Sequence, residues 1–327
     1  MKNILENTFD LGFFPTPLHY LPRLTNEFPD YKIYIKRDDH TGLATGGNKT
    51  RKLEYLLQDA IDQGCDTIIT AGAQQSNHCR QTAAACAIAG LNCHLLLGGI
   101  EPKQYDGNLL LSKTLGASIH FTGDNRKGED IHKIQSELSS KNKKCYVIPY
   151  GGSNSIGAMG FVVAIKELKE QLIALNQHID YIFFASSSGG MQAGLTLGID
   201  LYDLNTKLMP ISIDKAFTKD QVLEKIIFDI ITEGKQKLGI TKPLHQNDIS
   251  LIKGYDNQGY GVFTDNEKMA ISTLAKHEGI LLDPVYTGRA FYAMLDHLKQ
   301  KKIPQSNVLF WHTGGIPANF HYAKESI

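Results

Sequence analysis

The sequence predicts an α/β protein in which open, twisted, mostly parallel sheets carry helices on both faces. Short β-branched or aromatic runs alternate with amphipathic stretches along nearly all of the 327 residues, and strands that are connected through helices run parallel. Five of the turns after predicted strands are rich in Gly, Ser or Asn. Because such turns present backbone N–H groups at the carboxyl ends of the strands, we expect one shared, polar, anion-binding cleft.

The predicted strands are short apolar or β-branched runs bounded by turn residues. They cover residues 31–37, 66–72, 93–99, 118–123, 145–150, 181–186, 207–213, 249–254 and 307–313. Most of the stretches between them have helical periodicity. From Leu53 to Ile61, for example, apolar residues recur so that one helix face packs inward. Lys49 is therefore expected on the loop that leads into this helix.

Composition and charge exclude several classes of protein. A chain that is 42% hydrophobic and 21% charged has ordinary globular composition, and 34 basic residues balance 34 acidic ones. No net field therefore attracts nucleic acid or an anionic membrane, and no apolar run approaches the length of a membrane span. The five cysteines form no CxxC pair and are expected to be reduced thiols of a cytoplasmic protein without a metal site. A small-molecule partner is the expected ligand.

Three cations stand at the start of the helix in "GGNKTRKLEYL" (residues 46–56): Lys49, Arg51 and Lys52. The helix dipole disfavours cations in this position, so they need another explanation. A lysine on a Gly-flanked loop beside an anion site suits a Schiff-base cofactor, because a cationic and desolvated neighbourhood lowers the pKa of the amine. Lys52 would then neutralise a phosphate. The alternative is that all three cations are solvated.

The segment "FFASSSGGMQAGL" (residues 183–195) runs from an apolar strand through a Ser- and Gly-rich turn into a helix. This layout directs consecutive N–H groups towards a phosphate, although neither a dinucleotide fingerprint nor a P-loop is present. A simple tight turn explains the local sequence equally well.

Polar side chains crowd the turn "AGAQQSNHC" (residues 71–79). Ser76 or Asn77 is explained on its own as a helix N-cap. His78 has no second ligand at metal-binding spacing. Tyr260 and Tyr286 lie in Gly-rich turns and are better candidates for facing a cleft than for packing alone.

Six segments in the same order carry a resemblance to a known family: "GGNKTRKLEYL", "QSNHCRQTAA", "GGSNSIGAMGF", "SSSGGMQAGL", "LLDPVYTGRAF" and "HTGGIPA". The chain resembles the pyridoxal-phosphate enzymes of the D-cysteine desulfhydrase and 1-aminocyclopropane-1-carboxylate deaminase family, from "FPTPLHYLPRL" to the "HTGG" strand. These enzymes have the fold-type II architecture of the tryptophan synthase β subunit. The resemblance implies a large domain formed by residues 1–50 and 161–327, a small inserted domain formed by residues 51–160, and a homodimer.

The resemblance also implies roles for individual residues. Lys49 would form the Schiff base with pyridoxal 5'-phosphate, and Asn77 would contact the phenolic oxygen of the cofactor. The phosphate would be held by Lys52 and by the turn Ser187, Ser188, Gly189, Gly190 and Met191, in which Met191 replaces the family's usual threonine. Ser76, Tyr260 and Tyr286 would be catalytic residues on the substrate side with Lys49, and the two tyrosines would position the leaving group or stabilise it. The substrate carboxylate would bind at Ser76, Asn77, His78 and Gly152.

Two positions separate the activities within this family. The deaminases typically read "DPVYEG" and "HLGG" and place a glutamate beside the pyridine nitrogen, whereas this chain has Thr287 and Thr313. A carboxylate keeps that nitrogen protonated and deepens the electron sink, which helps to open a cyclopropane; a hydroxyl suits a substrate with a thiolate leaving group. We therefore expect α,β-elimination from D-cysteine. Aminocyclopropanecarboxylate deamination and cofactor binding without turnover remain the alternatives.

Overall fold

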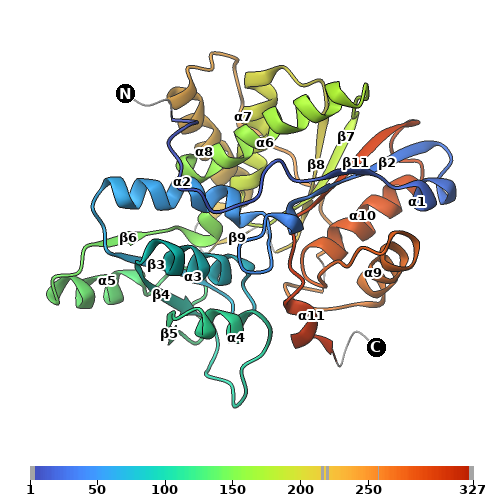
Figure 1. The fold of residues 1–327 in the computed structure, drawn as a ribbon. Coiled ribbons are helices and arrows are strands. Elements are labelled where there is room, and N and C mark those ends of the chain that lie inside the picture. Colours follow the sequence, from blue (N-terminus) through green and yellow to red (C-terminus); the bar gives the residue numbers. More distant parts are fainter. Residues whose placement is uncertain (1–3, 215–216, 219–220, 257, 324–327) are drawn as a thin grey trace.

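The computed structural model describes residues 4–214, 217–218, 221–256 and 258–323. Its larger sheet has five strands in the order β1 (Leu18–Tyr20), β2 (Tyr31–Arg37), β11 (Ser306–His312), β7 (Tyr181–Ser186) and β8 (Lys207–Ser212). The short edge strand β1 pairs antiparallel with β2, and the other neighbours pair parallel. Strands from both ends of the chain therefore lie side by side in one sheet (Figure 1).

Helices cover both faces of this sheet. Successive strand residues point to opposite sides, so neighbouring apolar residues pack against helices on different faces. Ile33 and Phe310 pack with α9 (Asp265–Glu278) and α10 (Thr287–Lys299). Their neighbours Tyr34 and Trp311 pack with α6 (Ser155–Ala174) and α7 (Gly190–Tyr202). The remaining helices of this part of the chain are α1 (Pro22–Glu27), α8 (Leu223–Leu238), which packs on α6 and α7, and α11 (Ala318–His321).

The second sheet has four parallel strands in the order β5 (Ser118–Phe121), β4 (Asn92–Leu97), β3 (Thr67–Gly72) and β6 (Cys145–Val147). One face packs against α2 (Lys49–Asp62), α3 (Asn77–Ala89) and α4 (Gly107–Thr114), and the other against α5 (Ile131–Ser140). All its strands come from the chain between β2 and β7, so Figure 1 shows it as a separate layer in teal and green.

The predicted α/β class is confirmed, and eight of the nine predicted strands are present. The prediction for residues 249–254 is wrong: this segment contributes only a single bridge between Ile211 and Ile252, and Gly254 has a φ of +97°, which is not the extended conformation of a strand. Three short strands escaped prediction: β1, β9 (Phe217–Thr218) and β10 (Gln221–Val222). Lys49 is the first residue of α2 rather than part of the preceding loop.

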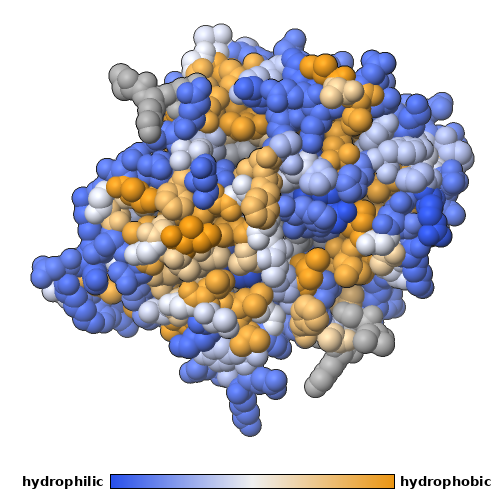
Figure 2. Space-filling model, in the orientation of Figure 1, coloured by the Kyte–Doolittle hydropathy of each residue, from blue (hydrophilic) through white to orange (hydrophobic). Residues whose placement is uncertain are grey.

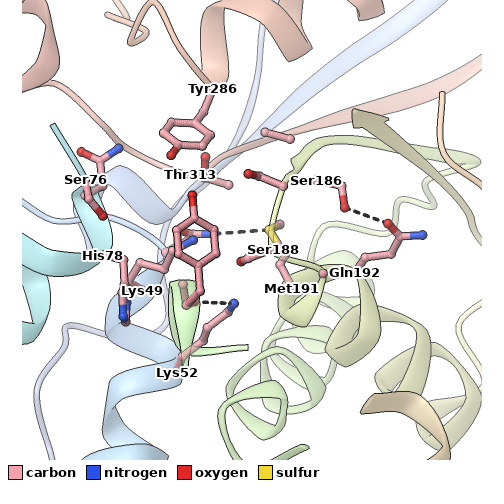
Figure 3. A pocket seen from close by; sticks show the side chains of 17 residues that line it. Lys49, Lys52, Ser76, His78, Ser186, Ser188, Met191, Gln192, Tyr286 and Thr313 are labelled. Carbon is pink, nitrogen blue, oxygen red and sulfur yellow. Dashed lines mark hydrogen bonds between the residues drawn. The ribbon is translucent and has the colours of Figure 1, made fainter. Parts of the chain in front are cut away.

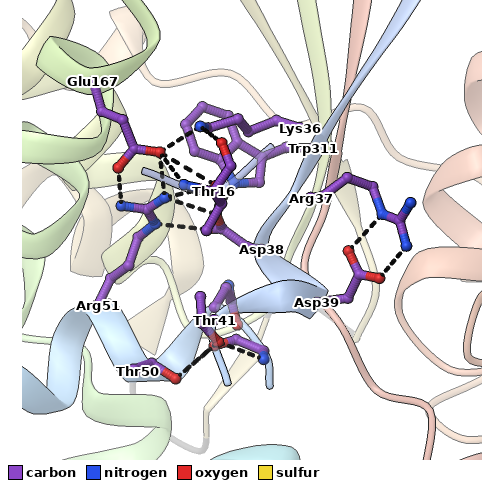
Figure 4. A network of polar contacts seen from close by, with 12 residues as sticks. Thr16, Lys36, Arg37, Asp38, Asp39, Thr41, Thr50, Arg51, Glu167 and Trp311 are labelled. Atoms are coloured by element: carbon purple, nitrogen blue, oxygen red, sulfur yellow. Dashed lines mark hydrogen bonds and ion pairs between the residues drawn. The ribbon is translucent and has the colours of Figure 1, made fainter. Parts of the chain in front are cut away.

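A buried network of charges fixes the start of α2 to the larger sheet (Figure 4). Arg51 donates to both carboxylate oxygens of Asp38 at 2.8 Å, and to Glu167 at 2.9 and 3.0 Å. Lys36 forms an ion pair with the same Glu167, and Trp311 donates to Asp38 at 2.8 Å. The network joins α2, β2, α6 and β11, and Arg51 at its centre lies two residues after Lys49.

The surface in Figure 2 is largely hydrophilic at its periphery, with apolar patches on the face where α3 and α4 lie. Exposed apolar side chains in this region include Ile88 on α3, Leu110 on α4, and Ile100 after β4. Among the described residues, no helix combines the length and apolar composition that a bilayer span requires.

Candidate active site

The Gly- and Ser-rich turns of both sheets meet at one pocket, which encloses about 650 Å³ of free space including its mouth. The turns after β3, β6, β7 and β11 and the first turn of α2 all contribute lining residues. Figure 3 shows Lys49, Ser76, Tyr286, Thr313 and Ser188 arranged around the same space.

The pocket lining contains most of the residues that the sequence placed in a site. These are Lys49, Lys52, Ser76, Asn77, His78, Ser187, Ser188, Gly189, Met191, Tyr286 and Thr313. Six further residues line the pocket: Asn48, Tyr150, Gly151, Ala185, Ser186 and Gln192. Gly151 and Ser186 belong to the predicted "GGSN" and "SSSGG" turns, and the other four were not predicted. Four predicted residues do not line the pocket: Gly152, Gly190, Tyr260 and Thr287.

Lys49 presents an amine without a partner. It is partly buried at the first position of α2, and within the described residues its amine has no hydrogen bond or ion pair. Burial lowers the pKa of Lys49 to about 8. A substantial fraction of the amine is therefore uncharged near neutral pH and available as a nucleophile or base.

Lys52 is a second cation without an acidic neighbour in the described part of the chain. Its side chain is 1% exposed, and its Nζ donates to the carbonyl oxygen of Gly151 and to Ser153 Oγ, both at 3.0 Å. Burial, followed by the charge of Lys49, places the pKa of Lys52 well below its ordinary value. A buried amine in this position is stabilised by a bound anion.

The start of α7 completes this anion site. Gly189 has a φ of +85° and precedes the first helical residue, Gly190. The Gly190 N–H donates to Ser153 Oγ at 3.1 Å, and Ser153 Oγ donates to Ser188 Oγ at 2.8 Å. A Cβ at Gly190 would lie 2.8 Å from Lys52 Nζ, so only glycine leaves this approach open. A helix N-terminus, two hydroxyls and a lysine thus converge, as phosphate binding requires.

Met191, where the family usually has threonine, packs at the edge of this site. Asn48 Nδ2 donates to Met191 Sδ at 3.4 Å, and the Asn48 N–H is bound by the carbonyl oxygen of Thr313 at 3.0 Å. Two hydroxyls already face the anion site, from Ser153 and Ser188. Ser153 was missed as a phosphate-side residue because the neighbouring Gly152 was expected to bind the substrate carboxylate.

The turn before α3 provides hydrogen-bonding groups of fixed direction. Ser76 is the N-cap of α3 and accepts from the Cys79 N–H at 3.2 Å, so the capping explanation is correct, and Ser76 also lines the pocket. Asn108, which was not predicted, donates to Asn77 Oδ1 at 2.9 Å. The Asn77 amide nitrogen is left as a donor, which suits contact with a phenolic oxygen.

His78 is neutral and carries its proton on Nε2. Thr70 Oγ1 donates to the Ile148 carbonyl oxygen at 2.8 Å and lies 2.9 Å from His78 Nε2, so it accepts the Nε2 proton. The Nδ1 atom is buried without a partner in the described structure. Burial, Lys49 and Lys52 push the pKa of His78 well below its ordinary value. Its free Nδ1 is therefore an acceptor, and the ring offers neither a free donor nor a positive charge to a carboxylate.

The Thr287 hydroxyl is bound within its own turn, and Thr287 does not line the pocket. Its hydroxyl lies 2.7 Å from both the Asp283 N–H and Asp283 Oδ1, and the side chain is fully buried. The Asp283 carboxylate also accepts the N–H groups of Val285 and Tyr286. Thr287 thus stabilises the turn before α10, and Thr313 is the threonine that lines the pocket.

Comparison with known proteins agrees with this geometry. The family described as "Pyridoxal-phosphate dependent enzyme" matches residues 9–314. The chain belongs to this family. It is a pyridoxal-phosphate dependent enzyme of fold type II, and its free lysine amine and converging phosphate-side donors fit the aldehyde and the phosphate of that cofactor.

Two curated relatives and one solved structure are similar over nearly the whole chain. A protein of Pyrococcus abyssi (strain GE5 / Orsay), named "Putative 1-aminocyclopropane-1-carboxylate deaminase", is 38% identical over 315 residues, covering 95% of this chain and 92% of the relative. A D-cysteine desulfhydrase of Salmonella paratyphi A is 40% identical over 319 residues, 94% of each chain. The crystal structure of an ACC deaminase homologue superimposes with a TM-score of 0.90 at 35% identity, covering 100% of this chain and 98% of that one.

Proposed function

We propose that this enzyme degrades D-cysteine to pyruvate, ammonia and hydrogen sulfide by α,β-elimination. The observation that carries the proposal is the composition of the pocket: a free lysine amine and several hydroxyls line it, but none of its 17 lining residues is acidic. The 40% identity to a protein named D-cysteine desulfhydrase supports the same substrate.

The absence of a carboxylate from the pocket lining bears on the leaving group. Pyridoxal phosphate, when bound, withdraws electrons from the substrate Cα. A carboxylate beside its ring nitrogen would strengthen that withdrawal, whereas a hydroxyl leaves the nitrogen largely neutral. We assign this contact to Thr313, because Thr287 is bound to Asp283. A weaker sink favours substrates whose Cβ substituent departs readily, such as a thiol.

The described residues in and beside the pocket have three further roles: proton removal, phosphate binding and carboxylate binding. Lys49 removes the proton from Cα, which requires the neutral amine that its lowered pKa of about 8 provides. Lys52, Ser153 and Ser188 hold the phosphate. Ser76 and the first N–H groups of α3 receive the substrate carboxylate, because a helix N-terminus binds anions. His78 offers no charge for this purpose.

Deamination of 1-aminocyclopropane-1-carboxylate is the second candidate, and two similarities favour it. Both the Pyrococcus abyssi relative and the solved structure with a TM-score of 0.90 carry that activity in their names. Either reaction would use Lys49 and the same phosphate site.

An assay with both substrates separates the two candidates. The purified enzyme loaded with cofactor is incubated with D-cysteine or with aminocyclopropanecarboxylate, and sulfide, pyruvate and 2-oxobutanoate are measured. We expect sulfide and pyruvate in equal amounts from D-cysteine and no 2-oxobutanoate. Turnover of the cyclopropane would show that a pocket lined without acidic residues suffices for ring opening, and would refute the choice made here.

We further propose a cytoplasmic homodimer with two domains in each chain. Residues 51–160 would form the small domain, because they supply every strand of the four-stranded sheet, and residues 1–50 and 161–327 the large one. The exposed Ile88, Ile100 and Leu110 provide apolar surface for the dimer contact. Sedimentation should give twice the 36.3 kDa chain mass; a species of single-chain mass at micromolar concentration would contradict the dimer.

A further inference from the structure

Tyr150 is a pocket residue that no motif indicated. It begins the short helix η2 (Tyr150–Gly152) after β6, and its side chain lines the pocket. Arg126 Nη1 donates to Tyr150 Oη at 3.1 Å. A guanidinium has no acceptor atom, so the tyrosine is the acceptor in this bond and its own O–H must donate elsewhere. No acceptor for that O–H exists among the described residues, which leaves a donor available to a bound ligand.

Arg126 is fixed beside Tyr150 by Asp214 and by the ring of Tyr260. It lies between β5 and α5 and donates to Asp214 Oδ2 at 2.7 Å, just beyond β8. Its guanidinium also stacks over the ring of Tyr260, 4.5 Å from the ring centre. These contacts place a permanent cation behind the Tyr150 hydroxyl, where it strengthens that hydroxyl as a donor.

The other two tyrosines of the cluster differ from Tyr150 in their contacts. The Tyr260 and Tyr286 hydroxyls lie 2.5 Å apart, and their mutual hydrogen bond uses one of the two O–H groups. Tyr260 does not line the pocket, and within the described residues neither hydroxyl accepts a hydrogen bond from a cation as Tyr150 does. Burial raises the pKa of both well above the ordinary value, followed by the proximity of Tyr150 for Tyr260 and of Tyr260 for Tyr286. Burial also raises the pKa of Tyr150, to about 12. The charge of Arg126 and its hydrogen bond lower this pKa, whereas Asp214 and Cys79 raise it.

We propose that Tyr150 is a further catalytic residue, whose hydroxyl donates a hydrogen bond to the sulfur that leaves Cβ, and that Arg126 is the residue that positions and polarises it. This inference rests on the proposed elimination. When Lys49 removes the Cα proton, the electron pair forms the Cα–Cβ double bond, and the pair of the breaking Cβ–S bond passes to sulfur. The donor stabilises the negative charge that develops there. The sulfur departs as HS⁻, and Tyr150 keeps its proton.

The test compares two leaving groups in Tyr150→Phe. With D-cysteine, loss of the donor should reduce kcat/KM by about 10²–10³-fold, as for the loss of one oxyanion donor. With β-chloro-D-alanine, whose chloride departs readily, the loss should stay below about 10-fold. Arg126→Met should shift the ratio of the two kcat/KM values in the same direction, and Arg126→Lys should restore part of the wild-type ratio. The double variant Tyr150→Phe/Arg126→Met should lose less kcat/KM with D-cysteine than the product of the two single losses.

Tyr146→Phe is the matched control. Tyr146 lies on β6 outside the pocket lining, and its hydroxyl donates to Asp59 at 2.6 Å. It should leave the ratio unchanged. Equal losses with both substrates would assign Tyr150 to substrate binding and overturn the proposal, and so would unchanged activity. If the wild-type enzyme turned over β-chloro-D-alanine but released no sulfide from D-cysteine, the proposed function would fail, and the role of Tyr150 towards sulfur would fail with it.

Discussion

Replacing Lys49 by alanine is expected to abolish turnover and the visible absorbance of the lysine-bound cofactor. Lys49 is the pocket lysine whose amine has no partner among the described residues, and burial lowers its pKa to about 8. Loss of a general base alone costs about 10²–10⁴-fold in rate, and loss of the covalent attachment adds to this. Activity assays and an absorbance spectrum of the reconstituted variant measure both effects.

Lys52→Gln is the comparison variant for Lys49→Ala. It removes a charge from the phosphate side of the same pocket but leaves the Lys49 amine in place. It should weaken cofactor affinity and retain the absorbance once the cofactor is in excess. A Lys49→Ala protein that keeps either turnover or the absorbance would refute the assignment of Lys49.

Replacing Arg51 by methionine is expected to lower the free energy of unfolding by about 3–5 kcal/mol, because the change leaves buried carboxylates without their cation. Arg51 is 3% exposed and binds both Asp38, which is fully buried, and Glu167. Burial raises the pKa of Glu167, but Arg51 and Lys36 outweigh it and hold the value at about 2. Urea unfolding of the apoprotein measures the change.

The pH dependence of the wild type should report the same network. Because the folded pKa of Glu167 lies below its ordinary value of 4.5, its stabilisation is present above pH about 4.5 and is lost as the pH falls towards 2. Lys225→Met is the control: its ion pair with Asp229 is 48% exposed on both sides and should contribute less than about 1 kcal/mol. An equally small effect of Arg51→Met would show that the network does not stabilise α2.

The fold was largely predictable because it follows from local patterns. The alternation of apolar strands and amphipathic helices fixes the class, and the residues at strand ends meet because parallel strands end at one edge. Residues 249–254 mislead because an apolar run alone does not reveal whether a neighbouring strand is available along its length. β1 is three residues long and carries too little pattern to predict.

Site residues were predictable only where the neighbouring residues in the sequence indicate their role. Lys49 stands out through its glycines and neighbouring cations. The direction of Thr287 is set by Asp283, whose carboxylate captures the hydroxyl, and nothing in "DPVYTG" shows this. Tyr150 and Arg126 are 24 residues apart and gain meaning only through their mutual contact. Such pairings depend on tertiary packing, which no single sequence window contains.

Reductive trapping of the cofactor tests the central claim most directly. The apoprotein is mixed with pyridoxal phosphate at a series of pH values, reduced with borohydride, and mapped by peptide mass spectrometry. The modification should lie on Lys49. A pKa of about 8 leaves about 10% of the amine neutral at pH 7, against about 0.03% for an ordinary lysine at 10.5. The initial rate should therefore rise with pH and level off above about 8. A label on another lysine, or a rate that rises tenfold per pH unit up to 10.5, would contradict the account.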